Sequence, residues 1–117
     1  MAAVELGRWG GWAFKQIEVE AQADKRTAIV AAVTGKRLRL LCLAGKADVA
    51  GTITLENGST ACSGEMSVVA TDPLPLPLIR PEDAPFMALM QADAGEAIKL
   101  ETVTCAFNGL AIYAEEV

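Results

Sequence analysis

The sequence predicts an all-β fold, namely a single-domain antiparallel β-sandwich of about seven or eight short strands with at most one short helix near residues 82–91. Several stretches alternate apolar and polar residues, which is the period of a strand with one buried face. Two Asn-Gly pairs mark tight turns next to such stretches. The chain has 117 residues, of which 52% are hydrophobic, and this suits one folded domain with one core.

The first fourteen residues are set apart by their composition. Both tryptophans of the protein, Trp9 and Trp12, lie here among three glycines, which make a regular helix costly. We expect residues 1–14 to form an N-terminal arm that packs its aromatic side chains on another surface. Residues 15–117 are then expected to form the β-sandwich domain.

Three strands are expected in the first half of the chain. Residues 16–23 alternate apolar and polar side chains, although a helix over the same residues is the alternative. Residues 27–33 are rich in β-branched and apolar side chains, which favours a strand. Residues 37–43 begin with one polar face and end apolar on both faces, so the end of this strand is expected to lie beneath another layer or another subunit.

A small basic patch, formed by Lys36, Arg37 and Arg39, marks the start of the third expected strand. Arg37 and Arg39 share one face of that strand because side chains alternate along it. The patch is interpreted either as a solvated strand face or as a site for an anionic ligand.

The middle of the chain predicts a hairpin. Residues 51–56 alternate again and are followed by Asn57-Gly58, the pair preferred in a type I′ turn, which needs positive φ at both central residues. The returning strand is expected over residues 59–62 and resumes over residues 66–70.

The last part of the chain predicts a long connection and two strands. All five prolines lie within residues 71–85, and proline cannot donate to a strand ladder, so this segment is expected to be extended and edge-like. A proline-rich ligand for another domain is the alternative interpretation. Acidic residues followed by apolar ones predict the short helix near residues 82–91. Strands are expected over residues 97–106 and 110–117, joined by a hairpin at Asn108-Gly109.

The charge of the chain is acidic overall and uneven along its length. The net charge is −5, which argues against a nucleic-acid partner because such binding needs clustered basic groups. Residues 1–60 carry eight basic and six acidic groups, and residues 61–117 carry two basic and nine acidic groups. Opposite-signed surfaces of this kind suit docking on a patterned partner or on further copies of the chain, and a solvated surface without a partner is the alternative interpretation.

The sequence also bears on membranes and on the compartment. No apolar run approaches the roughly 18 residues of a membrane span, and the N-terminus lacks the basic and apolar regions of a signal peptide. We therefore expect no membrane partner and synthesis in a cytoplasm. The three cysteines, Cys42, Cys62 and Cys105, are expected to be buried, reduced thiols.

The residues offer little for catalysis. The chain contains no histidine, which removes Ser-His and Cys-His nucleophiles and the usual ligands of catalytic zinc. Glu115 and Glu116 are neighbours in an expected strand and so point to opposite faces, while Glu82 and Asp83 suit a helix start. We therefore expect no catalytic residue, no metal and no cofactor, and no enzyme activity.

Five segments resemble a recurrent type of small virion protein of tailed phages. They are Thr34–Leu41, Gly51–Leu55, Asn57–Gly64, Ala94–Leu100 and Asn108–Val117. These segments look like capsid cement, head decoration and head-fibre-base proteins with jelly-roll or related β-sandwich folds. The resemblance implies a homotrimer that binds the major capsid protein on the outside of the capsid, where capsomers meet, and that is made in the host cytoplasm before it joins the virion.

Two sets of residues are candidates for the contacts of such a protein. The candidates for capsid docking are Arg8, Trp9, Trp12 and Phe14, because tryptophan and arginine are enriched among interface hot spots. The alternative is that both tryptophans cap the core of their own chain. The candidates for the trimer interface are Phe86, Met87, Leu89 and Met90, with a simple core plug as the alternative.

The sequence also allows a second function, which differs from that of a cement protein. A phage adsorption or glycan-binding β-sandwich module is the alternative, although such sites usually expose aromatic side chains and aromatic residues make up only 5% of this chain.

Overall fold

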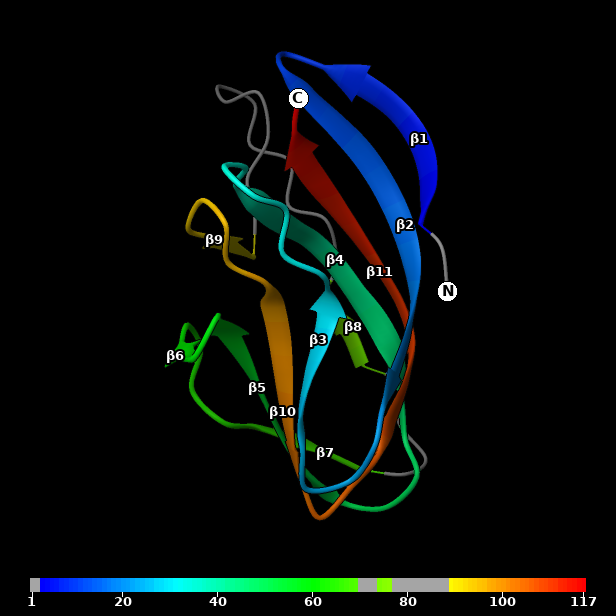
Figure 1. The fold of residues 1–117 in the computed structure, drawn as a ribbon. Helices are drawn as coiled ribbons and strands as arrows, with labels where there is room; N and C mark the ends of the chain where they lie inside the picture. The colour runs from blue at the N-terminus through cyan, green and yellow to red at the C-terminus, as the bar shows by residue number, and fades with distance from the viewer. Residues whose placement is uncertain (1–2, 70–73, 77–88) are drawn as a thin grey trace.

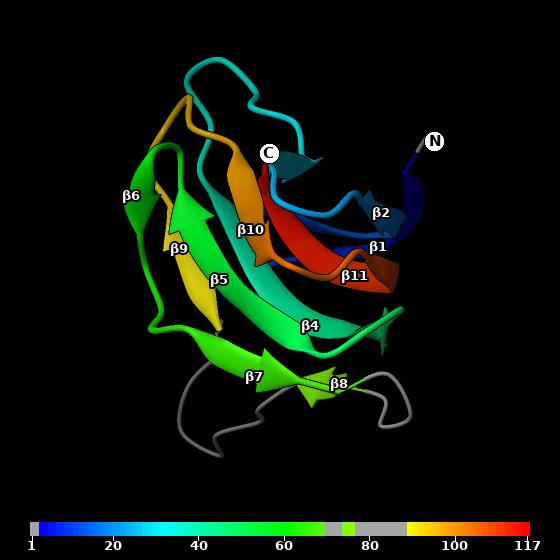
Figure 2. The same ribbon diagram turned by 90° about the horizontal axis from the view of Figure 1, so that it is seen from below.

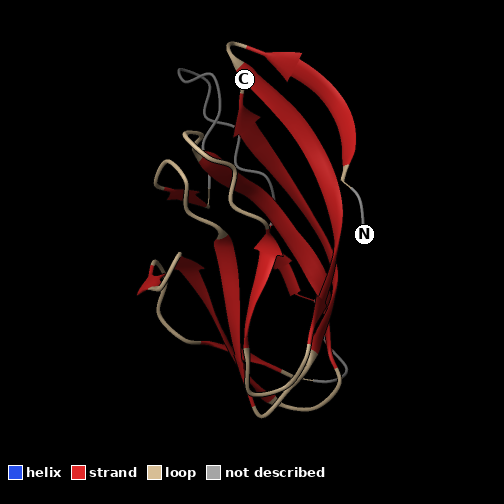
Figure 3. Ribbon diagram, in the orientation of Figure 1, coloured by secondary structure: helices blue, strands red, loops and turns tan. Residues whose placement is uncertain are grey.

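The computed structural model describes residues 3–69, 74–76 and 89–117, and this part of the chain consists of strands, turns and loops without a helix (Figure 3). The strands of the first half are β1 (Val4–Trp9), β2 (Trp12–Ala21), β3 (Arg26–Val30), β4 (Leu38–Ala47) and β5 (Gly51–Asn57). The strands of the second half are β6 (Thr60–Ala61), β7 (Met66–Val68), β8 (Leu74–Leu76), β9 (Met90–Ala92), β10 (Ile98–Val103) and β11 (Phe107–Glu116).

The strands form two antiparallel sheets that pack face to face (Figures 1 and 2). A six-stranded sheet has the order β1-β2-β11-β4-β8, with β9 also paired to β4. A five-stranded sheet has the order β3-β10-β5-β6, with β7 also paired to β5. If β1 is left out and β6–β7 and β8–β9 are each counted as one strand, eight strands remain, which we number one to eight from β2 to β11. The first sheet then has the order one, eight, three and six, and the second has the order two, seven, four and five. This is the strand order of a jelly roll.

The core lies between the sheets, because strands with one apolar face bury it against the facing layer. It draws on inward-facing residues of β2, β4 and β11 in one sheet and of β3, β5 and β10 in the other. The largest fully buried side chains are Val19, Leu38, Leu40, Leu43, Ile53, Ile98, Leu100, Thr102, Cys105 and Phe107.

The predicted all-β sandwich is confirmed, and β2 settles the choice between strand and helix for residues 16–21 in favour of a strand. The described chain contains more strands than expected because β1, β8 and β9 form in segments where no strand was expected. The helix expected near residues 82–91 lies mostly outside the described residues. At its described end the chain is extended instead, since Met90 begins β9.

The N-terminal fourteen residues are part of the larger sheet. β1 and β2 form a hairpin whose turn is made by Gly10 and Gly11, with φ of 57° and 84°, which glycine adopts without strain. β2 runs through the expected domain boundary after residue 14 and pairs with β11 along its whole length. β1 therefore extends the sheet as its outermost strand (Figure 1).

The hairpin at Asn57-Gly58 is confirmed, but its turn is centred one residue later. Asn57 pairs with Thr60, so Gly58 and Ser59 occupy the central positions. Gly58 has φ of 60° and Ser59 does not have positive φ, which matches a type II′ rather than a type I′ turn. The Asn57 side chain instead accepts a hydrogen bond from the backbone N–H of Asp93, at 3.0 Å.

The hairpin predicted at Asn108-Gly109 is wrong, because both residues lie inside β11. Gly109 stands opposite Gly45 of β4, and a side chain on Gly109 would overlap the backbone of Ala44 and Gly45. The glycine thus permits a close approach of two strands rather than a turn. The β10–β11 turn is made by residues 104–106.

Two aspartates from other loops hold the turn at residues 104–106. The Asp24 carboxylate accepts the Thr104 N–H at 2.9 Å, and the Asp48 carboxylate accepts the Ala106 N–H at 2.7 Å. Thr104 has φ of 73°, an unusual conformation for a β-branched residue, so these bonds support a strained position.

The proline-rich segment is described only at Leu74–Leu76. These residues form β8, which pairs with the β4 segment Leu43–Gly45 and lies at an edge of the sheet. An edge is where a strand tolerates proline, so this part of the expected edge-like connection is confirmed.

Candidate binding surface

An apolar cluster lies on the outer face of the six-stranded sheet, away from the core. Leu40, Leu43, Ala111 and Tyr113 point into the core, so the side chains next to them along β4 and β11 point outward. We use the name outer-face cluster for the apolar side chains that pack together there. They are Trp12 and Phe14 of β2, Leu41 of β4, and Ile112 and Ala114 of β11.

The composition of this face is unusual for the outside of an antiparallel sheet, whose outward positions are ordinarily polar. Trp12, Leu41 and Ala114 are buried, whereas Phe14 and Ile112 are half-buried. The apolar surface continues along β4 and β11 through three further half-buried residues. They are Cys42, Ala44 and Leu110.

Two arginines lie over the indole ring of Trp12. The guanidinium carbon of Arg39 is 4.4 Å from the ring centroid and that of Arg37 is 5.5 Å from it, both within range for a cation–π interaction. Arg37 directly precedes β4 and Arg39 is its second residue, and both lie over the same ring, so they share a face as the sequence predicts. The arginines place a positive charge at one end of the outer-face cluster.

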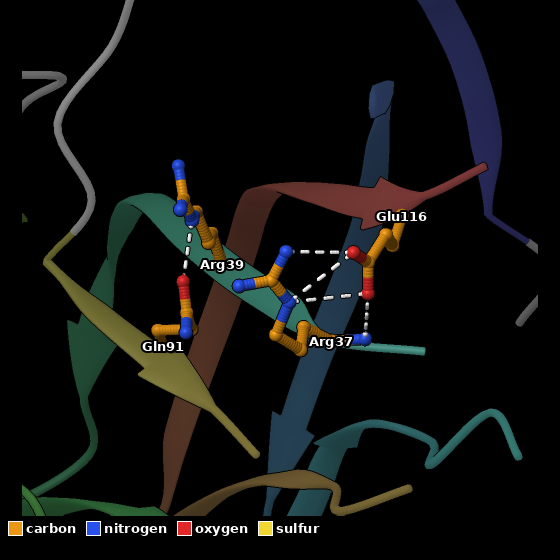
Figure 4. Close-up of polar contacts among 4 residues, drawn as sticks. All are labelled: Arg37, Arg39, Gln91 and Glu116. Atoms are coloured by element: carbon orange, nitrogen blue, oxygen red, sulfur yellow. Dashed lines mark hydrogen bonds and ion pairs between the residues drawn. The ribbon is translucent and has the colours of Figure 1, made fainter. Parts of the chain in front are cut away.

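Both guanidinium groups are oriented by hydrogen bonds (Figure 4). Arg37 forms a forked ion pair with Glu116 at the end of β11, in which Nη2 lies 2.7 Å from Oε2 and Nε lies 3.2 Å from both carboxylate oxygens. The backbone N–H of Arg37 also donates to Glu116, at 2.9 Å. Arg39 donates through Nε to the Gln91 side chain of β9 at 2.6 Å.

The ion pair shifts the titration of both partners. The hydrogen bonds from the side chain and backbone of Arg37 lower the pKa of Glu116 to about 2. The hydrogen bond to Glu116 and its negative charge raise the pKa of Arg37. Glu116 is therefore ionised at neutral pH, and the pair joins the start of β4 to the end of β11.

We expect the stability of the protein to fall with acid partly through Glu116. Its folded-state pKa of about 2 lies below the ordinary value of 4.5, so the pair stabilises the fold above about pH 4.5 and this contribution is lost as the pH falls towards 2. Urea unfolding at a series of pH values should therefore show a smaller loss of stability over this range in Glu116→Gln than in the wild type. In an Arg37→Met background the same substitution should have little effect on the pH dependence, and an equal effect in both backgrounds would contradict the assignment.

The structure brings together three of the four predicted docking residues. Trp12 and Phe14 belong to the outer-face cluster, and Trp9 stands opposite Trp12 in the β1–β2 pairing, so it faces the same side and is 53% exposed. Arg8 stands opposite Ala13 and therefore faces the other side, where it forms an exposed ion pair with Glu5 at 3.3 Å. The alternative, in which both tryptophans cap the core, does not hold for Trp9 because its side chain is exposed.

Sequence reasoning missed the part of the surface that β4 and β11 contribute. Arg37 and Arg39 were recognised only as a basic patch, and Ile112 and Ala114 only as members of a strand. The available signal was Leu41, where the third expected strand becomes apolar on both faces. It indicated a covered outer face but not which side chains share it.

Half of the predicted trimer-interface residues are described. Leu89 is partly buried against the core, and its N–H donates to the Leu40 carbonyl at 2.7 Å. Met90 is buried in the core and pairs with Leu40. Both therefore pack within their own chain, while Phe86 and Met87 lie outside the described residues.

A second polar feature lies on the outer face of the five-stranded sheet. Leu55 points into the core, so Glu56 points outward, yet it is only 2% exposed. Its Oε2 atom is 3.2 Å from Nε of Arg26, which also lies 3.0 Å from Glu101. Glu56 Oε1 is buried and has no hydrogen-bond partner among the described residues. Arg26 thus neutralises a carboxylate that has lost most of its contact with water.

The cysteines differ in exposure. Cys105 is buried, and burial raises the pKa of its thiol, so it behaves as a small core residue. Cys42 is half-buried on the outer face and Cys62 is exposed, so the expectation of burial is wrong for Cys62. Cys62 directly follows the two-residue strand β6, whose residues are themselves exposed.

Among the described residues, no group of three or more histidine, cysteine, aspartate or glutamate side chains is placed to hold a metal ion. No helix long and apolar enough to cross a membrane occurs in the same part of the chain. Comparison of the chain with protein-family models, with curated proteins and with solved structures gives no match.

Proposed function

We propose that the protein is a trimeric capsid cement protein that docks on the outside of a tailed-phage capsid and stabilises the shell. The observation that supports docking is the outer-face cluster with its two arginines. Aromatic residues and arginine are enriched at the centres of protein interfaces, and half-buried apolar positions on an outer sheet face gain most when a partner covers them.

The chemistry of the surface indicates the kind of partner that it fits. Phe14 and Ile112 offer apolar contact. Arg39, whose hydrogen-bond partner Gln91 is neutral, offers positive charge at one end of the same face, while Glu116 balances the charge of Arg37. A complementary partner has an apolar centre bordered by carboxylates. We assign this role to the major capsid protein, on the strength of the resemblance to decoration proteins and of the jelly-roll strand order. The strand order alone does not define a function.

The trimer in this proposal comes from the resemblance and has a physical rationale. Three copies around one axis repeat the same docking surface three times, which raises avidity without new contacts. A shell is then stabilised by the difference between the binding of the cement to the intact lattice and to the ruptured one. Met90 is already buried within its own chain, so it does not serve as the seam between subunits.

A binding experiment with capsids that lack the protein tests the proposal. We expect the wild type to co-sediment with such capsids and to raise the temperature at which they release DNA. Arg39→Glu should weaken binding by about tenfold or more, because it reverses a charge on the docking surface. Lys25→Glu is the matched control, since Lys25 is exposed in the turn between β2 and β3 and makes the same change of charge elsewhere.

The outcomes separate the two candidate functions. Equal DNA release temperatures with and without the protein would contradict the cement function. Binding on a glycan array that is lost in Trp9→Ala would favour the adsorption module in its place, because Trp9 is an exposed aromatic side chain.

A further inference from the structure

Strand β1 is an exposed sheet edge. All six of its residues are exposed, and no other described strand pairs with its outer side. Natural edge strands are commonly shielded by charges, prolines or a covering element, because a row of unpaired backbone groups invites another strand. β1 carries the charged residues Glu5 and Arg8, but it also carries three of the seven large hydrophobic residues that are exposed in the described chain. They are Val4 at 62%, Leu6 at 54% and Trp9 at 53% exposure.

A bulge in β1 determines which of its side chains share a face. The pairing with β2 shifts between Glu5 and Gly7, so Leu6 is the extra residue. Val4 and Trp9 stand opposite Gln16 and Trp12 and lie on the outer face of the sheet. Without the bulge, two residues five positions apart would lie on opposite faces.

The charged residues of β1 occupy the other face. Glu5 stands opposite Lys15, and Arg8 stands opposite Ala13. Lys15 and Ala13 lie two residues apart in β2, which pairs with β11 without a register shift, so they point to the same face of the sheet. Glu5 and Arg8 therefore share that face, which is opposite to the face of Val4 and Trp9. The order of side chains in β1 is therefore symmetric about Leu6 and Gly7, with a charged residue on each side of this centre and an apolar residue at each end.

We propose that β1 pairs in antiparallel fashion with β1 of a second copy of this chain, across a two-fold axis near Leu6 and Gly7. Two identical strands aligned in this way place Val4 opposite Trp9 of the second copy and Glu5 opposite Arg8 of the second copy. Both pairings join side chains on the same face, which direct cross-strand neighbours must share. The self-complementary order of charge and apolar surface selects a second copy over an unrelated strand.

This contact goes beyond the proposed function and is compatible with it. A two-fold contact through β1 leaves the outer-face cluster of each copy available for another partner, because β1 pairs through its backbone edge. If the proposed cement function holds, the contact joins neighbouring trimers, since adjacent three-fold positions on a closed lattice are related by two-fold axes. The self-association itself does not depend on a capsid.

Charge exchange between copies tests the pairing. Glu5→Arg places two arginines opposite each other in a homotypic pair, and Arg8→Glu places two glutamates opposite each other. Each variant should weaken self-association by about tenfold, because two symmetry-related attractive pairs become repulsive. An equimolar mixture of the two variants should associate as tightly as the wild type, since both arginines of one variant then face the two glutamates of the other.

Analytical ultracentrifugation over a concentration series gives the measurement, with circular dichroism to confirm that each variant is folded and with Lys25→Glu as the control for charge. Association of the mixture into larger species than either separate variant forms would establish the pairing. Equal association of both variants and the wild type, or a wild type that forms nothing larger than a trimer at any concentration, would overturn it. If the wild type does not bind capsids but the mixed variants associate as expected, only the cement function is contradicted. If the wild type binds capsids but the mixed variants do not associate, only the β1 contact is contradicted.

Discussion

Replacing Gly109 by alanine is expected to lower the free energy of unfolding by about 3 kcal/mol or to prevent folding altogether. A methyl group at this position would overlap the carbonyl group of Ala44 and the Cα atom of Gly45. These are backbone atoms in the neighbouring strand, so no change of rotamer relieves the overlap. The two central strands β4 and β11 would have to separate where Gly45 and Gly109 face each other.

Gly64→Ala provides the matched control for this prediction. A methyl group on Gly64 would meet nothing within 4 Å, and its φ lies outside the left-handed region. We expect its effect on stability to stay within about 0.5 kcal/mol of zero. Urea unfolding followed by tryptophan fluorescence and circular dichroism measures both variants. Similar stability of the two would mean that β4 and β11 do not approach each other as closely at Gly109 as described.

Arg26→Met is expected to destabilise the protein by about 2 kcal/mol, because it leaves the buried carboxylate of Glu56 without its ion-pair partner. The expected cost is below that of a fully buried pair, since the Arg26 side chain is 56% exposed and water screens it in part. Glu101 adds to the effect, because it loses the same partner and leaves a second carboxylate beside the first.

A double variant separates the cost of the unpaired charge from the loss of packing. Arg26→Met combined with Glu56→Met removes both charges, and we expect it to be more stable than Arg26→Met alone. Arg8→Met breaks the exposed pair with Glu5 and should change stability by about 0.5 kcal/mol or less. If Arg26→Met cost no more than Arg8→Met in urea unfolding, the burial of Glu56 would be without energetic consequence.

Most strands of this fold follow from local sequence, because alternation and β-branched residues are properties of neighbouring positions. Residues 16–21 are an example in which a single face is buried and the period of two is clear. Asn108-Gly109 misled the prediction because glycine serves two purposes, the tight turn and the close approach of strands. Only the pairing with Gly45, which is remote in sequence, distinguishes them.

The binding surface was predictable in part. Trp12 and Phe14 were selected for their residue types, and the structure places them with Leu41, Ile112 and Ala114. Their common face depends on register, which is set by pairing between distant strands and is not encoded in any one of them. The irregularity in the β4–β11 pairing between Ile112 and Tyr113 illustrates the difficulty, because a one-residue shift decides which side chains point outward.

The position of β11 has a consequence for the order of events during synthesis. This last strand lies in the middle of the larger sheet, between β2 and β4, and β10 lies in the middle of the smaller one, between β3 and β5. Until β10 and β11 leave the ribosome, each sheet lacks a central strand. Neither layer can therefore be completed before β10 and β11 have been synthesised, and we expect folding to be slow, as for other topologies dominated by distant partners.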